Sequence, residues 1–112
     1  MLIYKEQLPD DTLMFTDLEL YANTLEEAME RIISIGMQYD TPMVWFNADS
    51  KDTTSGKKAY EIICLGTGHY AENLTKKQYL GTLPVGPYIF HYFLTEGTKR
   101  KDMLLKFAED IL

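Results

Sequence analysis

Short runs of β-branched and aromatic residues recur along the whole chain, and residues that favour turns separate them. The clearest run is Tyr88–Leu94, with four aromatic rings in seven residues, between Val85-Gly86-Pro87 and Glu96-Gly97. Such side chains favour strands, and short turns favour antiparallel neighbours. The pattern predicts strands over residues 2–4, 13–21, 32–38, 43–46, 59–65, 79–82 and 88–94. Runs 32–38 and 43–46 are expected to form a hairpin.

Two segments predict helices. Thr24 with Glu27 three residues later is a capping-box pattern, so a short helix is expected over residues 25–31. Thr98 precedes an apolar stripe that predicts an amphipathic helix over residues 98–112. The expected fold class is therefore α+β: one domain, 1–112, with a small antiparallel β-meander sheet, a short internal helix and a C-terminal amphipathic helix.

The charge of the chain is unevenly distributed. The chain carries 11 basic and 17 acidic residues, for a net charge of −6. Residues 1–30 contribute −7, residues 31–56 contribute −1 and residues 57–112 contribute +2. An acidic chain argues against direct nucleic-acid binding. No apolar run reaches a membrane-spanning length and no signal peptide is expected. A single cysteine, Cys64, favours a reducing cytosol.

Two Gly-Thr pairs follow or end predicted strands, and they suggest an anion site. Gly66-Thr67-Gly68-His69 follows one strand, and Gly81-Thr82 ends another. Glycine turns can direct backbone N–H groups toward an anion. Lys76 and Lys77 lie between the two pairs in sequence. If the two corners converge, amides, hydroxyls and lysines would suit a phosphorylated ligand. The alternative is a plain turn with solvated lysines.

Catalytic and metal sites have little support in the sequence. His91 lies inside an aromatic strand, where a hydrogen-bonded, half-buried histidine is the simpler interpretation. No Cys or His spacing matches a zinc motif, so no metal or cofactor is expected. Cys64 lies in an apolar run and is expected to be inert packing. The chain is therefore interpreted as a protein that is not an enzyme.

Five segments, in order, resemble a family of small uncharacterised bacteriophage proteins. They are residues 32–38, 42–46, 66–69, 79–82 and 86–93. The resemblance covers residues 31–94 and treats the acidic segment 5–30 and the helix 98–112 as additions. It implies a phage accessory protein acting against host defence in the host cytoplasm. A looser similarity to the Thoeris anti-defence sponges implies sequestration of a cyclic nucleotide signal.

Two hypotheses follow. The first is a nucleotide-sequestering sponge, expected to be a homo-oligomer because apolar sheet faces self-associate. Its candidate ligand residues are Gly66, Thr67, Gly68, His69, Lys76, Lys77, Gly81, Thr82, His91 and Arg100. The second is an anti-CRISPR-type inhibitor that binds a host defence nuclease through an acidic surface. Its candidate residues are Asp10, Asp11, Asp17, Glu19, Glu26, Glu27 and Glu30.

Overall fold

A computed structural model describes residues 1–71 and 73–97 of the chain. The predicted C-terminal helix and Arg100 lie outside the described residues. In chain order the elements are β1 (Ile3–Gln7), β2 (Phe15–Tyr21), α1 (Leu25–Arg31), β3 (Ile32–Gln38), β4 (Thr41–Asn47), β5 (Lys57–Gly66), β6 (Tyr79–Val85) and β7 (Tyr88–Thr95). Short 3-10 turns occupy Ser50–Asp52 and Lys76–Gln78.

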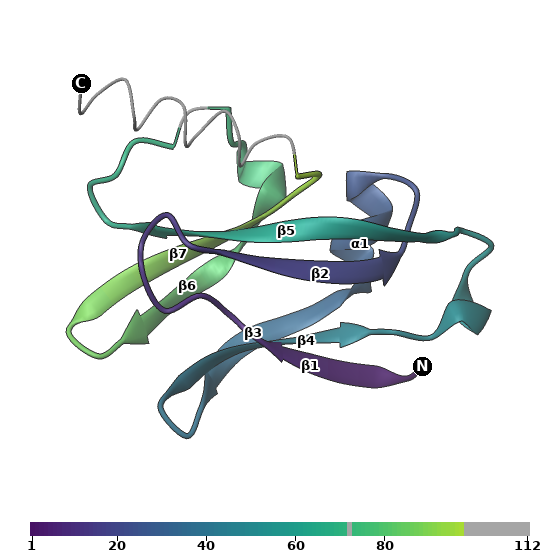
Figure 1. Cartoon of the computed structure of the whole chain (residues 1–112), viewed down its shortest axis with the longest axis horizontal. Helices are drawn as coiled ribbons and strands as arrows, with labels where there is room; N and C mark the ends of the chain where they lie inside the picture. Colours follow the sequence, from purple (N-terminus) through teal and green to yellow (C-terminus); the bar gives the residue numbers. More distant parts are fainter. Residues whose placement is uncertain (72, 98–112) are drawn as a thin grey trace.

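The strands form two antiparallel sheets that pack as layers (Figure 1). The first sheet has the order β1-β4-β3, and the second has the order β2-β5-β7-β6. The predicted hairpin of β3 with β4 is confirmed, and β6 pairs with β7 in a second hairpin. The antiparallel α+β class therefore holds.

The arrangement differs from the predicted single meander sheet. β2 pairs with β5 and β1 pairs with β4, so neither pairs with its neighbour in sequence. Burial gives the physical reason. Side chains from both sheets, among them Val44, Phe46, Tyr60, Ile62 and Tyr92, share one core. A single sheet would expose one of its apolar faces, because a helix as short as α1 cannot cover it.

β5 is the centre of this core. Its residues Ile62, Ile63, Cys64 and Leu65 are all buried, although successive strand side chains point to opposite faces. Ile62 and Cys64 face the other sheet. Ile63 and Leu65 face a smaller cluster with Leu13, Phe15, Ala71, Leu74 and Phe93. Both faces of β5 are therefore covered.

The two edges of the layered structure differ. On one side β3 and β6 approach closely: a Cβ built on Gly81 would lie 2.7 Å from Ile35 Cδ1. Gly81 also lies at a bulge in the pairing of β6 with β7. On the other side, the Thr16 hydroxyl of β2 donates to the Gln7 carbonyl of β1 at 3.3 Å. The first edge is closed by packing, and at the second a side-chain hydrogen bond joins the two sheets.

α1 forms where the capping pattern predicts it. The Thr24 hydroxyl accepts from the Glu27 amide at 3.2 Å, and the Glu27 carboxylate accepts from the Asn23 amide at 2.9 Å. The bond from Asn23, followed by one from the Ser55 hydroxyl, lowers the pKa of Glu27. Thr24 is therefore the N-cap, and Glu27 bonds back to the segment before it.

Candidate functional site

His91 joins the two Gly-Thr corners. Its Nε2 lies 2.8 Å from Thr67 Oγ1 and its Nδ1 lies 2.8 Å from Thr82 Oγ1. The Tyr79 hydroxyl also bonds Thr82 Oγ1. Register explains the meeting, because His91 on β7 is the partner of Leu65 on β5 and of Thr82 on β6. His91 is half-buried and hydrogen-bonded as expected, and it brings the threonines of the two corners together, a meeting that the sequence left open.

The Gly66–His69 segment is a tight turn. The His69 amide donates to the Gly66 carbonyl at 3.2 Å, and Gly68 has a φ of 95° that favours glycine. The Gly66 amide donates to the Thr12 hydroxyl at 3.0 Å. Two amides of the expected anion cradle therefore already have partners inside the protein. The geometry is that of the plain-turn alternative.

A hollow of about 440 Å³ lies beside this turn. Asp11, Thr12, Gly66, Thr67, His69, Pro87, Tyr88, Ile89 and Phe90 line it. The rings of Tyr88 and Phe90 are nearly parallel, 5.7 Å apart with an interplanar angle of 12°. Tyr88 is 61% exposed, so its ring is open to a ligand. The volume lies in the range of small-molecule sites.

The predicted lysines lie elsewhere. Lys76 and Lys77 form the 3-10 turn before β6, whereas the hollow lies near the β6–β7 hairpin that follows β6. Lys77 instead lines a smaller hollow of about 280 Å³ with Thr24, Leu25 and Met29. Gly81 contacts Ile35 across the sheet edge, and its role there is close packing. Of the predicted ligand residues that the structure describes, Gly66, Thr67 and His69 line the hollow, whereas Gly68, Lys76, Lys77, Gly81, Thr82 and His91 do not.

The predicted acidic surface is divided among several places. Asp10 and Asp11 lie between β1 and β2, and Asp11 lines the 440 Å³ hollow. Glu26, Glu27 and Glu30 lie on α1, where the Glu27 carboxylate accepts from the Asn23 amide before the helix. Asp17 and Glu19 lie on β2 and line a different cleft. The acidic residues are thus not one continuous face.

That cleft, of about 930 Å³, opens between the edge strands β1 and β2. Its carboxylates are Glu6, Asp17, Glu19 and Asp49, and its ammonium side chains are Lys51 and Lys57. Lys57 Nζ lies 3.3 Å from Glu19 Oε2. Tyr4, Tyr21 and Phe46 supply aromatic surface. This cleft was not predicted from the sequence, because it depends on which strands pair.

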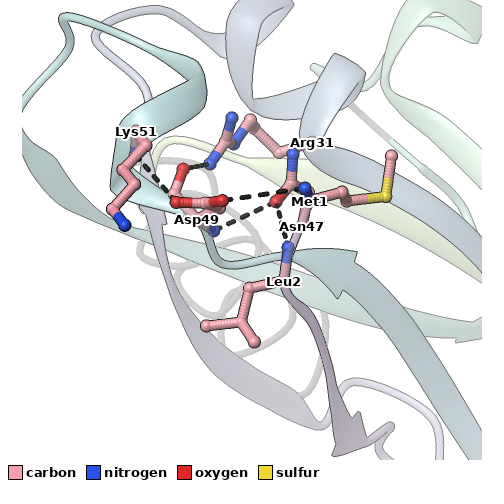
Figure 2. Close-up of polar contacts among 6 residues, drawn as sticks. All are labelled: Met1, Leu2, Arg31, Asn47, Asp49 and Lys51. Atoms are coloured by element: carbon pink, nitrogen blue, oxygen red, sulfur yellow. Dashed lines mark hydrogen bonds and ion pairs between the residues drawn. The ribbon is translucent and has the colours of Figure 1, made fainter.

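Figure 2 shows the polar cluster at one end of the cleft. The Asn47 side-chain oxygen accepts from the amides of Asp49 at 3.0 Å and of Leu2 at 3.4 Å. The Asp49 carboxylate accepts from the Lys51 amide at 2.9 Å, which is the main reason that its pKa is lowered. The buried Arg31 donates to the Asp49 carbonyl. These contacts tie the start of β1 to the end of β4.

Two groups with reactive side chains, Cys64 and Tyr92, are buried. Cys64 is fully buried, and burial raises the pKa of its thiol to about 12, so it is protonated at neutral pH. Burial also raises the pKa of Tyr92, whose hydroxyl donates to the Pro9 carbonyl at 2.7 Å. Within residues 1–71 and 73–97, no three His, Cys, Asp or Glu side chains gather as a metal site would require.

Across the described part of the chain, no helix has the length and apolar character needed to cross a bilayer.

Comparison with known proteins gives one family. No curated protein and no solved structure matches the chain. Residues 2–102 match a family described as a domain of unknown function (DUF7352). Because this match spans most of the 112 residues, the chain belongs to the DUF7352 family.

Proposed function

We propose that this protein is a phage-encoded anti-defence protein that acts in the host cytoplasm by binding, and that it sequesters a small cyclic nucleotide signal. The observation that carries the proposal is the convergence of Thr67 and Thr82 on His91, beside an open hollow with an aromatic wall. Sequestration needs recognition without reaction, and hydroxyl, imidazole and ring groups supply it.

The hollow suggests how a nucleotide would lie. A base stacks on the exposed ring of Tyr88, since every base has a face that can stack. Sugar hydroxyls and phosphate oxygens then face the Thr67 hydroxyl and the His69 ring. Lys76 and Lys77 lie apart from the hollow, so recognition depends on base and sugar more than on phosphate charge.

Isothermal titration against cyclic dinucleotides, cyclic trinucleotides and cyclic ADP-ribose isomers tests this proposal. We expect one compound class to bind and to be recovered unchanged. Tyr88→Ala should weaken binding by about tenfold or more, because stacking contributes about 1–3 kcal/mol per base. Tyr39→Ala is the matched control, since Tyr39 is 93% exposed in the β3–β4 turn. Absence of binding across the panel would overturn the proposal.

Self-association belongs to the same proposal. Tyr88 and Ile89 are 61% and 48% exposed and both line the hollow. A second copy packed on the β6–β7 hairpin would cover these apolar side chains and enclose a ligand. Light scattering after size-exclusion chromatography should then give at least twice the chain mass, and Ile89→Lys should return it to the monomer. A monomer at all concentrations would contradict this part.

The β1–β2 cleft favours a second candidate, inhibition of a host defence protein through acidic contacts. Asp17 and Glu19 lie there with Glu6 and Asp49. The test is phage plating on a host that carries the targeted defence system. Changing these four residues to their amides should abolish protection, whereas Glu26→Gln with Glu30→Gln on α1 should not. Protection that survives the fourfold change would refute this candidate.

A further inference from the structure

β1 is an edge strand with an unpaired side. It is the end of the order β1-β4-β3, and all five of its residues are exposed. An exposed strand edge presents backbone N–H and C=O groups that another strand can pair with. The pairing of β1 with β4 determines which backbone N–H and C=O groups face outward.

The hydrogen bonds at both ends of β1 show which of its residues bond to β4 and which face outward. The Ala48 amide donates to the Leu2 carbonyl at 2.7 Å, and the Leu8 amide donates to the Pro42 carbonyl at 2.8 Å. Bonded and non-bonded pairs alternate in an antiparallel ladder. Even-numbered residues of β1 therefore bond β4. The amides and carbonyls of Ile3, Lys5 and Gln7 face outward.

One contact agrees with this assignment. The Gln7 carbonyl accepts from the Thr16 hydroxyl of β2, so it does point away from β4. This contact lies at Gln7, the last residue of β1, after which the chain leaves the first sheet and continues to β2. From there toward Met1, the even-numbered residues Leu2, Tyr4 and Glu6 line the 930 Å³ cleft, and residues of β2 line it as well. The outward groups of Ile3 and Lys5 belong to the same stretch of β1.

The charge of the cleft indicates what kind of strand it would receive. Four carboxylates line it against three ammonium groups, those of Lys51, Lys57 and the Met1 amino terminus, so its formal charge is −1. Lys57 is paired with Glu19 and the Met1 amino group with Asp49, and Glu6 is the carboxylate on β1 itself. Side chains of an added strand alternate between the two faces of the sheet. Every second side chain would therefore lie over the cleft beside Tyr4 and Glu6, where positive charge is favoured.

We propose that the outward edge of β1 receives an extended, cationic segment of a partner protein as an added antiparallel or parallel strand. This inference rests on the second candidate function only in requiring a protein partner. It adds the mode of recognition: backbone hydrogen bonds to Ile3, Lys5 and Gln7 supply affinity, and the acidic cleft selects the sequence.

Lys5→Pro is the variant that isolates the backbone. Proline removes the outward amide of Lys5 and leaves the bonds from β1 to β4 in place, and edge strands tolerate it when the lost N–H faces solvent. Lys5→Ala is the matched control, because it removes the same side chain and keeps the amide. Urea unfolding of both variants establishes that they fold.

The probe is a capped eight-residue peptide in which lysine alternates with valine. Its counterpart, with glutamate in place of lysine, has the same strand propensity and opposite charge. We expect the lysine peptide to bind at least about tenfold more tightly than the glutamate peptide. Lys5→Pro should weaken it by about tenfold, the effect of one lost hydrogen bond, while Lys5→Ala stays within about twofold. Amide exchange at Ile3 and Lys5 should slow on binding.

Three results would overturn the inference. The lysine peptide fails to bind the wild-type chain, or it binds Lys5→Pro as well as Lys5→Ala, or a dimer lost in Lys5→Pro shows that a second copy occupies the edge. The second result separates this inference from the candidate function. Binding that is insensitive to Lys5→Pro but lost when Asp17 and Glu19 are neutralised would leave an acidic protein-binding surface without strand addition.

Discussion

β5 and β1 are both strands of five residues or more, yet their surroundings are opposite. β5 buries Ile62, Ile63, Cys64 and Leu65 in succession, whereas no residue of β1 is buried. The difference follows from position, since β5 lies between β2 and β7 and β1 lies at an edge. The stability of the fold is therefore expected to reside around β5, which leaves β1 available for contacts with other molecules.

Thiol reactivity should show the largest contrast. At neutral pH, Cys64 in the native protein should react with iodoacetamide about a thousandfold more slowly than an exposed thiol, because its pKa rises from 9.0 to about 12. A cysteine placed in β1 by Ile3→Cys provides the exposed thiol in the same molecule. Mass spectrometry of the two peptides gives both rates. Similar rates would mean that β5 opens as readily as β1.

The same raised pKa predicts a pH dependence. The unfolded chain loses the Cys64 proton near pH 9, whereas the folded chain retains it to about pH 12. The unfolded state then binds fewer protons, so the free energy of unfolding should fall as pH rises across this window. Tyr92, whose pKa is also raised by burial, acts in the same direction. Cys64→Ala should reduce the slope in urea unfolding; an unchanged slope would exclude Cys64 as a source.

A pair of isoleucine truncations should give the next largest contrast. Ile62→Ala removes a fully buried side chain from β5 and should lower the free energy of unfolding by about 2–5 kcal/mol. Ile3→Ala on β1, where Ile3 is 55% exposed, should change it by less than about 0.5 kcal/mol. Urea unfolding measures both. Equal losses would show that β1 contributes to the core after all.

Gly81→Ala tests the closed edge between β3 and β6. Gly81 has a φ of 155°, which disfavours any side chain, and the added Cβ would lie 2.7 Å from Ile35 Cδ1, so Ile35 must also move. The two effects together should cost about 1–3 kcal/mol. Gly56→Ala is the control, because nothing lies within 4 Å of a Cβ built there. Thermal unfolding compares them. If Gly81→Ala is as stable as Gly56→Ala, the β3–β6 edge is loose and resembles the β1–β2 edge.

Thr24→Ala should have the smallest effect. α1 connects the sheet of β5 to the sheet of β1, and the Thr24 hydroxyl caps it. Loss of the cap should cost about 1 kcal/mol, and Thr24→Ser, which keeps the hydroxyl, should recover most of it. Denaturant titration of the two variants provides the measurement. A loss in Thr24→Ser equal to that in Thr24→Ala would argue against capping as the cause.

Local features of the fold were predictable from the sequence, and the pairing of strands was not. The Thr24–Glu27 cap and the hairpin of β3 with β4 depend on nearby residues, and both were predicted. The pairings of β1 with β4 and β2 with β5 join residues far apart in sequence, so no local pattern specifies them. The two-sheet arrangement followed from those pairings.

The candidate site divides in the same way. The meeting of the two Gly-Thr corners was considered only as a condition, and the role of His91 in joining Thr67 to Thr82 was not predicted from the sequence. The positions of Lys76 and Lys77 depend on the path of the chain before β6, which the sequence pattern does not determine. The β1–β2 cleft arises only once the sheets are assembled.

The order of residues in β1 has a consequence for crowded solutions of this protein. If two identical edges paired antiparallel about their centres, Lys5 of one molecule would lie opposite Lys5 of the other. Like charges directly opposite destabilise a strand pair, and a lysine at the centre of an edge is a common protection against aggregation. One ammonium group thus discourages two copies from pairing through this open edge.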